Sequence, residues 1–293
     1  MTAIDPADDP RSHWWQSRAM RRFMRHRLAL LGVVMIVALT LTCFLGPYFL
    51  PYDSLYVDLR ARFAPPMTGQ HYLGTDPLGR DIAARLLEAG QVSLQVGFYA
   101  MILSTVIGTL VGVIAGYRGG WTAAVLMRIV DAFLAFPSIF LTLALAALLK
   151  PSPVMITVII AVTSWMEVAR IVDAEVRSLR EREFVLAGRM LGLGSRHIMF
   201  REILPNVLGP IIVAATLTVA RAILLEAYIS FLGYGIQPPL PSWGNMLNGA
   251  QQYLDKAPWL AIIPGITITI AVTSFNFIGD GLRDALDVRA ERN

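Results

Sequence analysis

Long runs of apolar residues, each long enough to cross a lipid bilayer, are the feature that most constrains the fold of this chain. A membrane-spanning helix needs about 20 apolar residues. Because a bilayer offers no water to unpaired backbone groups, each run is expected to be an α-helix. The sequence therefore predicts an all-α membrane protein with six transmembrane helices. The runs cover roughly residues 28–50, 91–116, 123–149, 154–172, 207–233 and 259–278.

The composition favours the same class. Hydrophobic residues make up 55% of the 293 residues and charged residues 16%, whereas a soluble domain carries about 25% charged residues. The single cysteine, Cys43, lies inside the first run and is interpreted as a packing residue. That run is longer than the apolar core of a cleaved signal peptide, about 7–15 residues, so we expect it to remain as an anchor.

Positive charges are distributed unevenly between the two sides of the predicted bundle. Of the 25 basic residues, 18 lie on the side of the N-terminus, six lie on the other side, and Arg221 lies within a span. Cytoplasmic connections carry the excess of Lys and Arg in membrane proteins. We therefore expect residues 1–27, the loop 173–206 and the tail 279–293 to be cytoplasmic, and we see no nucleic-acid-binding face.

On this scheme residues 28–90 form the first transmembrane helix and a periplasmic segment, and residues 91–278 form the transmembrane core. Within the second span, Ser104, Gly108, Gly112 and Gly116 recur every four residues. Small residues on one helical face let two helices approach closely in lipid, so we predict a packing seam there. Three other spans contain a proline that is expected to interrupt the helix: Pro137, Pro210 and Pro264.

Charged residues inside the spans are costly, about 2.5–3.5 kcal/mol each at a helix centre on insertion scales. Arg128 and Asp131 stand three residues apart, and we interpret them as a structural ion pair. Arg221 and Glu226 are about 140° apart around a helix, so each needs a different partner. Glu226, with Ser230 one turn further on, either lines a solute pathway or bonds to a neighbouring helix.

Between the first two spans, Asp76-Pro77 is interpreted as an N-cap followed by the first residue of an amphipathic helix. In the cytoplasmic loop, residues 182–191 are expected to form a second short amphipathic helix. Gly192 would end it in a left-handed cap, and Ser195 would cap the helix that follows. A helix, a glycine and a second helix make a compact knob that suits a groove on a partner protein.

The loop sequence from Glu183 to Gly192, followed by Ile203-Leu-Pro-Asn206, resembles the Glu-Ala-Ala loop of permeases from binding-protein-dependent ABC importers. Four of its residues fit that pattern: Ala187, Gly192, Leu204 and Pro205. Leu186 stands where the family usually has Glu, and Gly188 stands where it usually has a second Ala. The resemblance implies a coupling helix that docks on a cytoplasmic ATPase subunit.

Other motifs extend the resemblance over most of the chain, from about residue 23 to residue 288. They lie at residues 71–81 (HYLGTDPLGRD), 116–121 (GYRGGW), 127–131 (MRIVD), 230–239 (SFLGYGIQPP), 242–244 (SWG) and 279–284 (GDGLRD). Together they resemble the C-type permease subunit of dipeptide and oligopeptide importers. The fold implied is that of a type I ABC importer permease.

That resemblance implies a subunit of the bacterial inner membrane that moves peptides with energy from ATP. Its partners would be a second, homologous permease, two ATP-binding cassette subunits and a periplasmic substrate-binding protein. ATP and Mg²⁺ would be used by the ATPase subunits, with no cofactor, metal or catalytic residue on this chain. The residues agree, since a phosphate-binding loop needs Gly-Lys-Ser/Thr, whereas Lys150 precedes Pro151 and Lys256 precedes Ala257.

Three alternatives remain open at this point. The same machinery could carry another small solute, such as a nickel chelate, glutathione or an opine. An ion-coupled secondary transporter would be expected to show inverted repeats, which we do not find. A membrane-embedded enzyme would need a nucleophile and base or metal ligands in the spans, yet all four histidines lie outside them.

Overall fold

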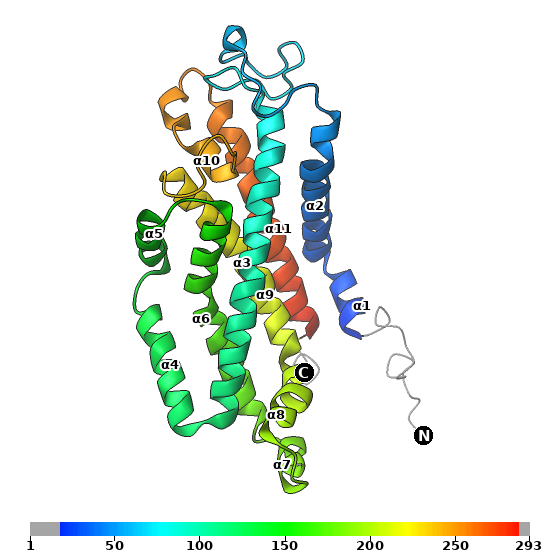
Figure 1. Cartoon of the computed structure of the whole chain (residues 1–293). Coiled ribbons are helices and arrows are strands. Elements are labelled where there is room, and N and C mark those ends of the chain that lie inside the picture. The colour runs from blue at the N-terminus through cyan, green and yellow to red at the C-terminus, as the bar shows by residue number, and fades with distance from the viewer. Residues whose placement is uncertain (1–17, 287–293) are drawn as a thin grey trace.

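The computed structural model describes residues 18–286, which form a bundle of long helices (Figure 1). No β-strand occurs within this range. The α-helices are α1 (Arg18–Arg25), α2 (Arg27–Leu45), α3 (Ile82–Arg118), α4 (Gly120–Leu134), α5 (Ser138–Leu148), α6 (Pro153–Leu179), α7 (Glu183–Met190), α8 (Ser195–His197), α9 (Leu204–Phe231), α10 (Trp243–Leu247) and α11 (Trp259–Leu286). Short 3₁₀ or π-helical segments are η3 (Gly46–Phe49), η4 (Leu59–Ala61), η5 (Ile198–Ile203) and η6 (Ala250–Tyr253).

Five helical segments of the described chain are long and apolar enough to cross a membrane. They contain α2, α3, α6, α9 and α11. The predicted span 123–149 contains α4 and α5, which are apolar enough together to cross a membrane but meet at a bend of 81°. Pro137 lies at that break and precedes the first residue of α5, whereas α9 and α11 continue past Pro210 and Pro264. The prediction of an all-α, multi-pass membrane protein is confirmed.

The predicted seam of small residues joins α3 to α6. A Cβ atom on Gly108 would lie 2.6 Å from the backbone oxygen of Trp165, and one on Gly112 would lie 2.6 Å from that of Ala169. Successive glycines of α3 therefore meet successive turns of α6. Since only a hydrogen atom fits in this space, the glycines allow the two backbones to touch along much of their length.

The start of α3 differs from the prediction. Its N-cap is Asp81, whose carboxylate accepts a hydrogen bond from the amide of Ala84 at 2.8 Å. Asp76 instead accepts from the amides of Leu78 and Arg80, inside the preceding loop. The expected separate amphipathic helix is thus the first part of α3, because the cap that starts it lies five residues later than predicted.

The two ends of the bundle carry different structures (Figure 1). One, the α7 end, holds α1, α7, α8 and the last turns of α11, and the other, the loop end, holds residues 46–81 and α10. The predicted cytoplasmic segments 1–27 and 279–293 lie partly outside the described residues.

Candidate functional site

Two cavities follow one another along the line where α6 and α9 meet, and together they are called here the α6–α9 groove. The upper cavity, which is the one nearer the loop end, has a volume of about 320 Å³ and is lined by α5, α6 and α9. The lower cavity, about 640 Å³, is lined mainly by α6, α9 and the end of α11. Glu167, Ile171 and Glu175 of α6 line the groove and recur every four residues, so they share one face of the helix.

An ion pair between Glu167 and Arg221 lies in the wall of the upper cavity. The two side chains come from near the middle of α6 and α9, yet they are 54% and 62% exposed. Contact of such charges with lipid would be expensive, and charged residues within spans almost always face a bundle interior or a water-filled cavity. This face of the chain therefore belongs against water or another protein.

Residues with hydroxyl groups share the cavity with the ion pair. Ser138, Ser164 and Tyr228 line the same cavity. Thr218 also lines it, while its hydroxyl donates to the carbonyl oxygen of Ala214 at 2.7 Å. The upper cavity can thus offer hydrogen bonds as well as charges of both signs to a polar solute.

The lower cavity continues the groove toward the α7 end. Gly209, Pro210 and Leu217 contribute from α9, so the proline inside this helix lies at the cavity wall. Glu175 of α6 and Arg283 of α11 add one charge of each sign. The groove therefore carries opposite charges both near its middle and at its lower end.

Glu226 and Ser230, predicted as pathway residues, are not part of the groove. Glu226 is fully buried, and its two carboxylate oxygens accept hydrogen bonds from Ser93 of α3 at 2.8 Å and Ser230 at 2.7 Å. Ser93 also accepts from the amide of Trp243 in α10. The carboxylate joins three helices, which favours the second interpretation, bonding to a neighbouring helix.

The predicted ion pair between Arg128 and Asp131 is also corrected. Asp131 of α4 pairs with Arg170 of α6 instead. Spacing within one helix indicates that two side chains can meet, but it does not reveal a stronger partner on the next helix. For the same reason Arg221 stands out in the sequence, whereas Glu167, the acidic residue of the span 154–172 that pairs with it, does not.

The loop predicted to couple the chain to a partner forms a compact knob at the α7 end. Gly192 ends α7 with φ of 79°. The amide of Leu193 donates to the carbonyl of Gly188 at 3.0 Å, and that of Gly192 donates to Arg189 at 3.0 Å, which is the Schellman pattern of helix termination. The predicted glycine cap is present, whereas Gly194, not Ser195, caps α8.

The knob has one buried face and one exposed face. Val185 and Gly188 point inward, and Val185 packs with Ile198 and Ile203 in a cluster that also contains residues of α3, α6 and α9. Met190 and Leu191 are 90% and 81% exposed. Of the predicted coupling residues, Gly188 is buried and Leu204 is half-buried. The exposed ones are Glu183, Leu186, Ala187, Gly192 and Pro205. An apolar surface at this position is suited to contact with another protein.

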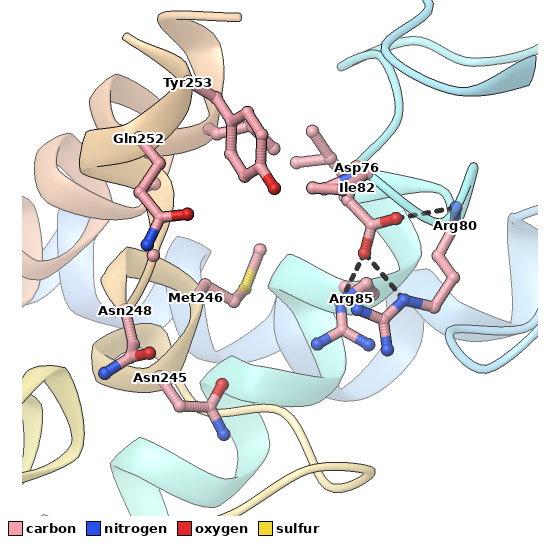
Figure 2. A pocket seen from close by; sticks show the side chains of 13 residues that line it. Asp76, Arg80, Ile82, Arg85, Asn245, Met246, Asn248, Gln252 and Tyr253 are labelled. Atoms are coloured by element: carbon pink, nitrogen blue, oxygen red, sulfur yellow. Dashed lines mark hydrogen bonds and ion pairs between the residues drawn. The ribbon is translucent and has the colours of Figure 1, made fainter. Parts of the chain in front are cut away.

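At the loop end, a smaller cavity of about 210 Å³ lies between the start of α3 and the segment around α10 and η6 (Figure 2). Asp76 lies between two arginines, with 2.6 Å to Nε of Arg80 and 3.8 Å to Nε of Arg85. These contacts tie the loop 76–80 to the first turn of α3. We interpret the cluster as a structural anchor for the loop end.

Comparison with known proteins agrees with this architecture. The model for the binding-protein-dependent transport system inner membrane component matches residues 108–292, and that for the N-terminal TM domain of oligopeptide transport permease C matches residues 13–66. A putative peptide permease protein of Brucella suis is 43% identical over 97% of this chain and 94% of its own length. The oligopeptide transport system permease protein OppC of Escherichia coli is 40% identical over 94% and 91%.

Among solved structures, the MetNI methionine ABC transporter in inward-facing conformations has a chain that matches with a TM-score of 0.55 at 20% identity. The match covers 67% of this chain and 93% of that one, and it shows the shared fold. The family resemblance predicted from the sequence motifs is confirmed. The chain belongs to the family of binding-protein-dependent transport system inner membrane components.

Proposed function

We propose that this chain is a permease subunit of an ATP-driven importer that moves dipeptides or oligopeptides across the bacterial inner membrane. The observation that carries the proposal is the half-exposed Glu167–Arg221 pair in a groove between two spans. A surface with charges near its middle needs water or a polar partner opposite it. A peptide pathway between this chain and a second, homologous permease would supply both.

The α6–α9 groove is one half of that pathway in this proposal. Its lower cavity is the larger of the two and lies nearer the α7 end. Charges of both signs and several hydroxyl groups suit solutes that carry both an ammonium and a carboxylate. The relatives named as peptide permeases support this substrate class.

Energy would come from two ATP-binding cassette subunits in the cytoplasm, which would use the ATP and Mg²⁺. Their contact on this chain would be the exposed face of the knob, with Leu186, Ala187, Met190 and Leu191. Because Val185 anchors α7 in the same cluster as α3, α6 and α9, a movement of the knob would reach the helices that line the groove. A periplasmic binding protein would deliver the peptide at the loop end.

Uptake in cells tests the proposal directly. A strain that lacks this chain, and retains all other components of the system, is given a labelled dipeptide or a labelled nickel chelate. We expect dipeptide uptake to be lost and to return with the intact gene. Unchanged dipeptide uptake with loss of another solute would contradict the peptide assignment. Uptake that depends on an ion gradient and not on ATP would contradict the proposal of an ATP-driven importer.

A further inference from the structure

The upper cavity presents one positive and one negative side chain from two facing helices. In the described part of the chain, Glu167 of α6 and Arg221 of α9 are the only charged residues that line this cavity. They contact each other, yet both remain more than half exposed. Because apolar side chains do not enclose the pair, a solute in the groove can reach each charge.

A short peptide carries the complementary charges. Its C-terminal carboxylate matches the fork of N–H donors on an arginine guanidinium, and its N-terminal ammonium matches a glutamate carboxylate. We infer that Arg221 binds the C-terminal carboxylate and Glu167 binds the N-terminal ammonium of a peptide during its passage through the upper cavity. The inference rests on the proposed function and names the substrate groups that the groove recognises.

Exchange of partners keeps the charges paired throughout. Without a peptide, Glu167 and Arg221 neutralise each other. As a peptide enters, each terminus takes the place of one wall residue, so that two ion pairs replace one and no charge is left unpaired. This matters because an unpaired charge within a membrane-spanning region is expensive. After the peptide leaves, the two side chains close on each other again.

The length of the side chains limits which peptides can use both contacts at once. Two residues in extended conformation span at most about 7 Å. Glutamate and arginine have long, flexible side chains that can separate by about this distance. Dipeptides are thus expected to engage both residues together, whereas a longer peptide engages them one at a time.

The test compares charge variants in the complete transporter, reconstituted in lipid vesicles with its partner subunits and its binding protein. The variants are Arg221→Gln, Glu167→Gln and the reversed pair Glu167→Arg with Arg221→Glu. The control removes another half-exposed pair, between α4 and α6, by Asp131→Asn with Arg170→Gln, since neither residue lines either cavity of the groove. Uptake of a labelled dipeptide is compared with uptake of its C-terminal amide.

For Arg221→Gln we expect uptake of the free-acid dipeptide to fall at least tenfold and uptake of the amide to change less than twofold. For Glu167→Gln, uptake of the free dipeptide is compared with uptake of its N-acetylated form, which lacks the ammonium group. The reversed pair should recover part of the free-acid uptake, because it still offers one charge for each terminus. Loading of the binding protein with each peptide is measured separately, and the uptake rates are corrected for the binding protein's preference among the peptides.

Equal losses for the free acid and for the amide would overturn the inference, and would indicate that the pair only packs against the second permease. Stimulation of ATP hydrolysis by the loaded binding protein gives a separate readout. If stimulation persists and every peptide enters each variant at the wild-type rate, the inference fails while the proposed function stands. If the wild-type complex moves no peptide at all, the proposed function fails instead.

Discussion

Arg221 and Glu226 lie five residues apart on α9 and have opposite surroundings. Arg221 lies at an open cavity and contacts a single acidic residue of α6. Glu226 is enclosed by α3, α9 and α10, where serine hydroxyls bond both of its oxygens. The angle around the helix separates a group that can meet a solute from one that holds the fold together.

Helix α6 also has one enclosed face and one open face. The backbone at Trp165 and Ala169 touches the glycines of α3, whereas Glu167 and Ile171 line the groove. Substitutions on the enclosed faces should change the amount of folded chain. Substitutions on the open faces should change transport by each folded chain. Measuring both quantities for every variant tests this division.

The largest effect is expected for Gly112→Leu. A Cβ atom there would lie 2.6 Å from the backbone oxygen of Ala169, so α3 and α6 must move apart. Overpacking of this kind costs typically about 1–3 kcal/mol and more where backbone is in the way. We expect almost no folded transporter by size-exclusion chromatography in detergent. Gly265→Leu is the control, because no atom lies within 4 Å of a Cβ at that position.

Glu226→Leu should come next. It leaves the hydroxyls of Ser93 and Ser230 buried without their acceptor, at about 1–3 kcal/mol for each unsatisfied group. We expect at least a tenfold loss of folded transporter, and normal uptake by the fraction that remains. Glu226→Gln should be milder, since an amide still accepts a hydrogen bond from one serine. Normal abundance with altered peptide preference would place Glu226 on the pathway after all.

Ala187→Trp tests the open face of the knob. Ala187 is exposed on α7, so a large side chain there should leave folding intact and interfere only with a protein that docks on it. We expect unchanged abundance, peptide uptake lowered at least fivefold, and weaker co-purification of the ATPase subunits. Arg196→Gln, at an exposed position of α8, is the control. Full uptake in Ala187→Trp would argue against docking at this face.

The smallest effect is expected for the double variant Asp131→Asn with Arg170→Gln. Exposed ion pairs contribute about 0–1 kcal/mol, and removing both partners leaves no unpaired charge. Abundance and uptake should both stay within twofold of the wild type. A large loss of uptake here would mean that half-exposed pairs in this chain matter wherever they lie, and would remove the distinction made for Glu167 and Arg221.

Most of the fold could be predicted because it depends on local properties of the sequence. Apolar runs of span length located the membrane-crossing helices, Pro137 lies where α4 and α5 separate, and Gly192 ends α7 as expected. The start of α3 was less predictable, since both Asp76 and Asp81 are suitable caps. Hydrogen bonds in the loop occupy Asp76 and leave Asp81 to begin the helix.

The candidate site was harder to predict because it depends on which residues meet across helices. Glu226, a pathway candidate in the sequence, is enclosed, while Glu167, to which no motif in the sequence points, lies at the groove. One signal was available. Arg221 in one span needed an acidic partner, and the span 154–172 contains a single acidic residue, Glu167.

By itself the sequence determined the class of protein, the location of its long apolar helices, the shape of the knob and the family, since each of these follows from runs, caps and motifs along the chain. Only the tertiary structure decided which face of α6 and α9 is open, which charges pair and which carboxylate is enclosed. The physical reason is that the rotation of one helix against its neighbours is set by the sum of all contacts between them, including the glycine seam of α3, and no single helix carries that information.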